Sequence, residues 1–460
     1  MSKSDASRKS GTPVLVVTTI GSFLMMLALS AVNVALPEMG TDLSMNAVSL
    51  GWVALAFTLS TGMFLVPLGK LADMLGRTAM FVFGIWIFTG ASLFLAVSSH
   101  SWMVIAFRAV QGLGCAMFFV TVLAILVSAY PPEESGKVLG IHVASTYAGL
   151  TVGPFIGGLL TQNFGWRSVF FINVPIGLAV AVLSMWKFPP HRAKTSANGF
   201  DVTGSFIYIV TLFAALYGFS LIPHLTSIVF ITVGVIGAVV FVWWETRTEN
   251  PVLDLSLFTH NAVFTLSSTA ALISYAAIFS MTFLLSFYLQ YIKSLTPLKA
   301  GLVLVCQPAV MAILSPVAGR LSDKIEPRVL ASVGMALIAA CLFFLASLSY
   351  QTSLAAVIID VSLLGAGIAL FSSPNINAIM SSVGDRLHSV ASSMVATARS
   401  LGQILSMGIA MLTFALFIGQ AQITPPLYSA LLRASRTAFI IFGILCGIGV
   451  FASLARGNVR

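Results

Sequence analysis

The sequence predicts an all-α membrane protein that crosses the bilayer many times. Of its 460 residues, 58% are hydrophobic and only 8% are charged, and the mean hydropathy is +1.01. Soluble domains carry about 25% charged residues, so a water-soluble fold of this length is excluded. Uncharged runs of roughly 18–25 residues recur along the whole chain, and this is the length that crosses about 30 Å of hydrocarbon.

Fourteen such runs predict fourteen transmembrane helices. Runs seven and eight are separated by little more than "IPHL" (222–225), so a count of thirteen stays open. The expected spans are 13–36, 49–69, 79–99, 102–127, 138–160, 168–186, 202–222, 225–244, 262–287, 297–318, 329–349, 353–380, 391–417 and 437–455.

The lysines and arginines are divided unequally between the two sides of the membrane. With a cytoplasmic N-terminus, sixteen lie on the cytoplasmic side, and five lie on the other side. This bias follows the positive-inside rule. We therefore expect an even number of spans with both termini cytoplasmic, in the inner (plasma) membrane. The net charge of +9 reflects this topology, because no basic stretch carries the interleaved aromatics of a nucleic-acid surface. The five are Arg167, Lys293, Lys299, Arg433 and Arg436.

Two further features limit the class of protein. The basic segment "MSKSDASRKS" precedes an uncharged run that is too long for a signal-peptide core, so we expect a retained first helix. The four cysteines all lie inside spans, and no CxxC occurs, so we expect neither disulfides nor a metal site.

An internal repeat divides the chain. "GKLADMLGR" (69–77) follows the second span, and "GRLSDKIEPR" (319–328) follows the tenth. Because the copies are eight spans apart, two helices are inserted between two six-helix halves. Internal duplication around a central substrate site is typical of secondary transporters. The expected units are two pseudo-symmetric six-helix bundles, at 1–195 and 259–460, and an inserted helix pair at 196–258.

The ordered motifs resemble the major facilitator superfamily, in its fourteen-helix drug:proton antiporter branch. Any one of them is a weak signal, but the ordered set covers most of the chain. The motifs are "GKLADMLGR", "RAVQGLG" (108–114), "GLTVGPFIGG" (149–158), "WRSVFFINVPIG" (166–177), "FDVTG" (200–204) and "FYLQ" (287–290).

The resemblance implies that the 69–77 loop is a cytoplasmic latch. Asp73 would bond Arg77 and the N-terminus of a neighbouring helix, which the helix dipole and charge-assisted hydrogen bonds favour. The alternative is a tight loop with solvated charges. The second copy lacks a glycine that matches Gly76. The latch residues are Gly69, Asp73, Gly76 and Arg77, with Gly319 and Asp323 in the second copy.

The stretch "GLTVGPFIGG" presents small residues at a spacing of four. Gly149, Gly153 and Gly157 share one helix face, where a neighbouring backbone can approach closely. Pro154 removes a backbone donor and bends the helix. A generic packing face is the alternative interpretation. The resemblance implies an antiporter hinge, which also includes Gly158, between helices 5 and 8 or their family equivalents, and this contact would help to close the cavity on one side.

Asp360 is the one acid that lies clearly inside an apolar run, "AAVIIDVSLLG". An intramembrane carboxylate is expensive and is a functional candidate. The alternative is an interfacial residue near a helix end. Arg108 lies at a similar depth, roughly 10 Å into the matching helix of the other half. We expect the two to face each other across the cavity, to pair when the outer side is closed, and to separate when Asp360 is protonated.

Polar residues within the spans predict the lining of a substrate cavity. The family resemblance also implies an acid in helix 1, but "LALSAVNVALP" has Ala28 there. With Arg108 and Arg399 against Asp360, the predicted core is net positive, which suits neutral, zwitterionic or anionic amphiphiles at least as well as cations. The predicted lining residues are Asn33, Gln111, Tyr288, Gln290, Asn375, Asn377 and Arg399.

No sequence feature points to an enzyme or an ATP-driven pump. There is no GxxxxGK[ST], no HExxH and no carboxylate cluster. We expect a monomeric, proton-coupled multidrug-type exporter of amphiphilic small molecules, which works by alternating access, has no cofactor and uses the proton gradient. One alternative is a dedicated exporter of an endogenous lipid-like, siderophore or metabolite substrate. The alternative from another class is a membrane sensor or scaffold that does not transport.

Overall fold

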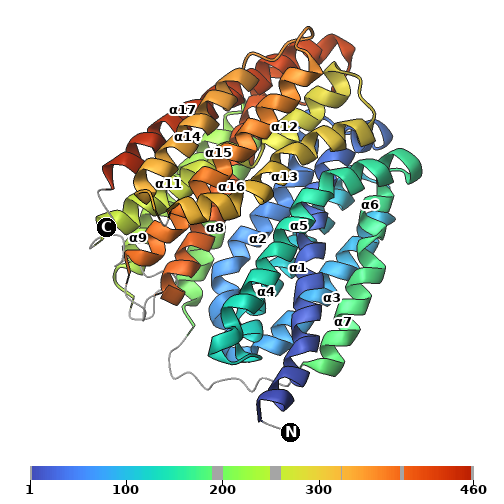
Figure 1. Ribbon diagram of the computed structural model, residues 1–460. Helices are drawn as coiled ribbons and strands as arrows, with labels where there is room; N and C mark the ends of the chain where they lie inside the picture. The colour runs from blue at the N-terminus through green and yellow to red at the C-terminus, as the bar shows by residue number, and fades with distance from the viewer. Residues whose placement is uncertain (1–2, 189–199, 249–260, 323, 384–387, 457–460) are drawn as a thin grey trace.

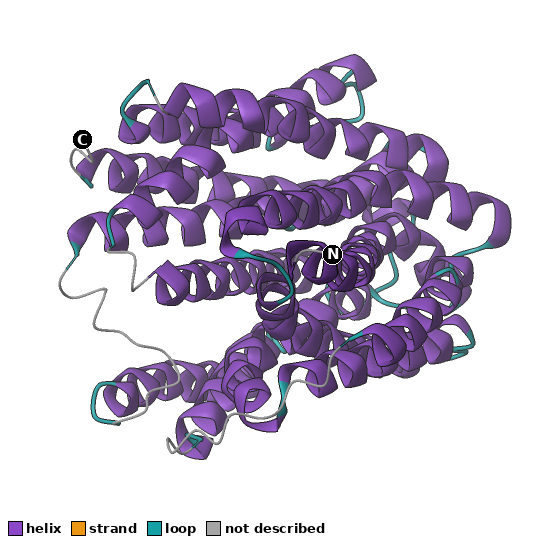
Figure 2. Cartoon of the chain, turned by 60° about the horizontal axis from the view of Figure 1, so that its bottom comes forward, coloured by secondary structure: helices purple, strands orange, loops and turns teal. Residues whose placement is uncertain are grey.

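The computed structural model describes residues 3–188, 200–248, 261–322, 324–383 and 388–456, and this part of the chain is helical without any strand (Figures 1 and 2). Fourteen of its helices are long and apolar enough to cross a membrane, which confirms the predicted number. Spans seven and eight are the separate helices α8 (Val202–Ser220) and α9 (Thr226–Glu245), so the count of thirteen is wrong.

The first six spans follow one another with short turns. Pro175 breaks the sixth into two helices because it cannot donate a backbone hydrogen bond. The helices are α1 (Lys3–Asp42), α2 (Ala47–Leu75), α3 (Arg77–Ala96), α4 (Ser101–Ser128), α5 (Pro132–Phe164), α6 (Arg167–Phe171) and α7 (Asn173–Lys187).

The last six spans begin with an interrupted helix. Its central break is held by Ser406, whose hydroxyl accepts the backbone N–H of Ser280 at 2.9 Å. The elements are α11 (Ala262–Ile278), α12 (Met281–Phe287), the π-helix η1 (Tyr288–Ile292), α13 (Pro297–Ser322), α14 (Pro327–Leu345), α15 (Leu354–Ser381), α16 (His388–Phe417), the 3₁₀ turn η3 (Pro425–Leu427) and α17 (Tyr428–Ala455).

The last span begins earlier than its apolar run suggests. Arg433 and Arg436 were expected in a loop, but they lie within α17 with their side chains exposed. A hydropathy pattern ends a span at the first charges. The helix itself continues, because its backbone hydrogen bonds are all internal and the charged side chains stay outside the core.

The helices pack in a pattern that occurs twice. α1 packs on α5, α2 and α3 both pack on α4, and α3 also contacts α7. In the same way α11 packs on α16, α13 and α14 both pack on α15, and α14 also contacts α17 (Figure 1). The same glycine contact recurs at matching places. A Cβ on Gly112 would collide with the carbonyl oxygen of Phe57, and one on Gly365 with that of Gln307.

The pair α8 and α9 lies outside this pattern. The two helices pack on each other, and α8 also contacts α2 and α16 (Figure 1). The Tyr208 hydroxyl of α8 donates to the carbonyl oxygen of Gly62 in α2 at 3.3 Å. The pair therefore touches one helix from each group.

Both chain ends lie at one end of the helices, and we call this the terminal end (Figure 1). The opposite end, here called the distal end, carries the turns at 43–46, 97–100, 165–166, 221–225, 293–296, 346–353 and 418–427.

Candidate functional site

Hydrogen bonds join the two groups of helices at the distal end. Pro37 cannot donate to the carbonyl of Asn33, four residues earlier in α1. The hydroxyl of Ser286 in α12 takes that place and donates to the Asn33 carbonyl oxygen at 2.7 Å. Gln290 of η1 donates through Nε2 to the Val34 carbonyl oxygen at 2.9 Å and to Ser286 Oγ at 3.0 Å. The segment α12–η1 is thus held against α1 at the point where Pro37 interrupts the hydrogen bonding of α1.

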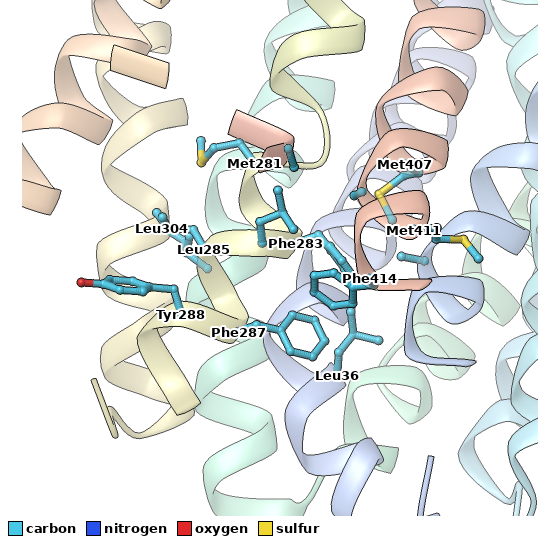
Figure 3. Close-up of a cluster of buried hydrophobic side chains, with 14 of the residues drawn as sticks. Leu36, Met281, Phe283, Leu285, Phe287, Tyr288, Leu304, Met407, Met411 and Phe414 are labelled. Atoms are coloured by element: carbon cyan, nitrogen blue, oxygen red, sulfur yellow. The ribbon is translucent and has the colours of Figure 1, made fainter. Parts of the chain in front are cut away.

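Aromatic side chains of α12 and α16 pack together next to these hydrogen bonds (Figure 3). The ring of Phe287 lies 5.6 Å from that of Phe414 in α16, and Phe283 lies 5.4 Å from the same ring. Leu36 of α1 points into this cluster from the other group (Figure 3). We call Leu36, Phe283, Phe287 and Phe414, together with the bonds of Ser286 and Gln290, the distal seal.

The glycine stretch of α5 packs against two neighbouring helices, α1 and α13. A Cβ on Gly149 or Gly157 would collide with backbone atoms of α1, and one on Gly153 with Ser30 of α1. Gly158 instead meets the backbone of Pro297 at the start of α13.

On the α13 side of this contact, Gly301 lies against the carbonyl of Pro154. The predicted contact with the family equivalent of helix 8 is thus made by Pro154 and Gly158, whereas the regular glycine face packs on α1.

Arg108 is buried within its own group of helices. Its Nε donates to the carbonyl oxygen of Val53 at 3.0 Å, and Nη1 donates to Gln111 Oε1 at 2.6 Å. Gln111 in turn donates to Ser92 Oγ at 2.8 Å. The guanidinium also lies 4.4 Å from the centre of the Phe57 ring. Among the described residues it has no carboxylate partner, so its charge is held by dipoles and an aromatic face.

Asp360 is buried within the other group. It is 6% exposed and lies beside Cys341 of α14, and its Oδ2 has no hydrogen-bond partner among the described residues. An unpartnered carboxylate oxygen in such a place is costly when ionised.

Arg108 and Asp360 therefore do not pair in this structure, although the distal seal is formed. Each side chain points into its own group of helices: Arg108 bonds to α2, and Asp360 lies against α14.

The 69–77 loop forms the predicted local ion pair. Arg77 Nε donates to Asp73 Oδ1 at 2.7 Å, and both side chains are partly exposed. Gly76 has φ 102°, a conformation that other residues rarely adopt. The pair joins the end of α2 to the first residue of α3, and among the described residues Asp73 accepts no backbone N–H at the N-terminus of a neighbouring helix.

The remaining latch residues make few contacts. Gly69 and Gly319 have open space around the position of a Cβ. Asp323 lies outside the described residues.

The predicted cavity residues do not converge on one place. The Gln290 side chain belongs to the distal seal, and Asn33 contributes its backbone carbonyl there. The Tyr288 hydroxyl donates to the carbonyl oxygen of Ser349 at 2.8 Å, and the side chain points away from the phenylalanine cluster (Figure 3). Gln111 is bound within the Arg108 network.

Two predicted asparagines stabilise the terminal end of α15. Asn377 donates to Ser322 Oγ at 2.8 Å. Asn375 donates to the Ser267 carbonyl at 3.0 Å and accepts from Arg456 Nη1 at 2.7 Å. Arg456 is 2% exposed, and it was not predicted, because a residue so close to the chain end shows no sign of burial in the sequence.

Arg399 also lies between the two groups of helices. Its guanidinium carbon lies 5.2 Å from the centre of the Tyr275 ring of α11. Tyr147 of α5, in the other group, is near enough to both side chains to interact with them electrostatically. Neither tyrosine was predicted, because only the folded arrangement brings α5, α11 and α16 together.

Comparison with known proteins is consistent with this architecture. The family model of the Major Facilitator Superfamily matches residues 18–407. The chain is 30% identical over 446 residues to the riboflavin transporter RibZ of Clostridioides difficile, covering 96% of each chain. It is 30% identical over 401 residues to the multidrug resistance protein Stp of Mycobacterium tuberculosis, covering 86% of this chain and 74% of Stp.

Two further comparisons agree. The methylenomycin A resistance protein of Bacillus subtilis is 30% identical over 414 residues, and 88% of each chain is covered. The crystal structure of a bacterial homologue of the human lysosomal transporter Spinster, in an inward-facing and unoccupied conformation, superposes with a TM-score of 0.71 at 15% identity, covering 99% of this chain and 98% of that one. This likeness concerns the fold.

The fold and these relatives define a class of protein: a multi-pass transporter of the plasma membrane, not an enzyme. The chain belongs to the major facilitator superfamily.

Proposed function

We propose that this transporter exports amphiphilic small molecules in exchange for protons, by alternating access, as a monomer and without a cofactor. The moving units are the bundles 1–195 and 259–460, with the pair 196–258 between them. The repeated packing pattern supports this division, because each helix of a group makes its most extensive contacts with a helix of the same group.

The distribution of charge gives the orientation. By the sequence assignment of loops, sixteen of the lysines and arginines fall on the side of the termini and five on the other side. We therefore propose that the termini are cytoplasmic and that the distal seal faces the outside. In this orientation the structure is a state closed to the outside. Transport then requires the seal to open and the bundles to meet at the terminal end, where Asp73 and Arg77 would act as the latch.

The observation that carries the proposal is the environment of Asp360. A buried carboxylate with an unpartnered oxygen and no ion pair among the described residues favours its protonated form, and it ionises only when its surroundings change. A change in the packing of α15 against α14 as the bundles move supplies such a change. Arg108 contributes a fixed positive charge in the opposite bundle. The proposed coupling therefore links the conformational cycle to one proton site without a direct ion pair.

A dedicated metabolite transporter is the second candidate. It is favoured by the similarity to RibZ, which extends over 96% of both chains and is named as a riboflavin transporter.

Proteoliposomes with an imposed pH gradient test the proposal. A panel of cationic, neutral and anionic amphiphiles is added, and proton movement is followed with a pH-sensitive dye inside the vesicles. We expect a response to several compounds that is lost in Asp360→Asn. Asp42→Asn is the matched control, because that carboxylate is exposed and pairs with Arg167 at the distal end.

The outcomes separate the candidates. A response to many compounds supports the multidrug exporter, and a response to a single compound supports the dedicated transporter. A response that is unchanged in Asp360→Asn would contradict the proton site. No response to any compound would favour the non-transporting sensor or scaffold.

A further inference from the structure

Three side chains from three helices meet between the two groups of helices. Arg399 of α16 lies about 16 Å along its helix from His388, which places it deep within the span. Tyr275 of α11 lies under its guanidinium at 5.2 Å, and Tyr147 of α5 approaches from the other group. We call these three residues the arginine–tyrosine cluster.

The charge of this cluster is not balanced. Among the described residues, Arg399 forms no ion pair, and its Nε has no hydrogen-bond partner. The polar side chains near its guanidinium are those of Tyr275 and Tyr147, and no carboxylate is among them. Arg108 is also without a carboxylate partner, but its guanidinium makes bonds to Val53 and Gln111. Arg399 therefore differs in having a buried Nε donor without a partner among the described residues, besides its side-chain hydrogen bond with Tyr275.

The contacts around Arg399 place the cluster between helices of the two bundles that we propose to move. Gly402, close by on α16, lies against α11 at Leu272 and Tyr275, while Gly62 of α2 lies against Ile404 and Ser400. Tyr147 belongs to α5, whose backbone meets α13 at Gly158 nearer the distal end. The cluster thus lies on the terminal side of the contacts that close the distal end. A molecule that enters from the terminal end would reach it before it reaches the seal.

We propose that the arginine–tyrosine cluster is the substrate-recognition site and that it selects organic anions, in which a carboxylate, sulfonate or phosphate is attached to an aromatic ring. The anionic group pairs with Arg399, whose planar guanidinium suits two parallel hydrogen bonds to such oxygens. The aromatic ring packs against Tyr147 and Tyr275, which offer flat apolar faces with a polar edge.

This inference rests on the proposed function and narrows its substrate class. The export of an anion in exchange for an incoming proton moves charge in one direction across the membrane. An inside-negative membrane potential therefore drives both halves of the exchange. A cationic substrate would instead bring a second positive charge next to Arg399, with Ala28 in place of the helix-1 carboxylate that could offset it.

Equilibrium binding to the purified protein in nanodiscs tests the inference without any gradient. The probes are tritiated 2-naphthoate and its neutral isostere 2-naphthamide, which have the same ring and differ in charge. We expect naphthoate to bind about tenfold more tightly or better, as charge-assisted pairs are stronger than neutral ones. Arg399→Gln should abolish this preference by weakening naphthoate binding far more than naphthamide binding, and the remaining naphthamide binding shows that the variant is folded. Arg433→Gln, on the exposed distal part of α17, is the matched control.

The inference would be overturned by equal binding of the two probes to the wild-type protein, by no binding of either, or by a preference that persists in Arg399→Gln. Failure of the proposed function looks different. If the binding preference depends on Arg399 but no compound moves protons in proteoliposomes, the anion site is supported and the proton coupling is contradicted. If protons move with cations alone and naphthoate does not bind, the proton coupling is supported and the anion site is contradicted.

Discussion

Gln290→Leu should shift the transporter away from the state that is closed at the distal end. The Gln290 amide bridges two elements, donating to Val34 of α1 at 2.9 Å and to Ser286 at 3.0 Å. Leucine keeps a similar volume and removes both bonds. A net hydrogen bond is worth about 0.5–1.5 kcal/mol in general and about 0.6 kcal/mol on average within membranes. Only the bond to Val34 crosses between the two groups of helices, because Ser286 lies in the same group as Gln290. Its loss therefore costs the closed state about 0.6–1.5 kcal/mol, which changes the ratio of closed to open molecules by a factor of about 3–13.

Spin labels at the two sides of the distal end measure this change. Val97 and Tyr350 are exposed there, on opposite groups of helices. Both are replaced by cysteine in a Cys306→Ala background, because Cys306 is the one native cysteine that is not buried. We expect Gln290→Leu to add a population at longer distance. Gln351→Leu, an exposed glutamine in the neighbouring loop, is the control.

Two results would refute the reasoning. One is a distance distribution in Gln290→Leu that matches the wild type. The other is an equal shift in Gln351→Leu, which would show that the effect does not come from the distal seal.

Two further predictions concern stability. Gly112→Ala and Gly365→Ala should each lower the melting temperature in detergent, because the added methyl group meets a backbone carbonyl of the adjoining helix at a cost of about 1–3 kcal/mol. Gly447 has open space around it, so Gly447→Ala should melt within error of the wild type. Equal melting temperatures for all three variants would contradict the close helix contact. Gly76→Ala should also destabilise the folded protein by about 1–2 kcal/mol, because φ is 102° at Gly76. Gly319→Ala, in the second copy of the loop, is the control. A Gly76→Ala protein that is as stable as the wild type would show that the turn relaxes.

Much of the fold could be predicted from the sequence because lipid imposes a simple rule. Apolar runs of sufficient length must become helices, and they gave the number of spans. The boundaries were less certain wherever charges sit on an exposed helical turn, as Arg433 and Arg436 do at the start of α17.

The site was predictable only in part. Asp360 could be found because an acid in an apolar run is rare, and its burial follows from its position. Its relation to Arg108 could not be found, because depth along a helix does not tell which neighbour the side chain faces. Gln111 and Tyr288 were predicted as cavity residues but are bound within one group of helices, for the same reason.

One proline in the sequence indicates a contact between α1 and another helix. A proline inside a span leaves a carbonyl without its helical donor, and Pro37 therefore predicts that a donor from elsewhere meets Asn33. The structure supplies it from Ser286. By contrast, nothing in the sequence relates Tyr147 to Arg399, since their contact depends on how the two groups of helices are placed.

The measurement that tests the central claim most directly is proton release on substrate binding. Purified protein in weakly buffered detergent solution is mixed with the panel compound that moves most protons, and the pH change is recorded for the wild type and for Asp360→Asn. The account predicts that the wild type releases protons and that Asp360→Asn binds the compound without releasing any. Equal release from both proteins would contradict the assignment of Asp360 as the proton site.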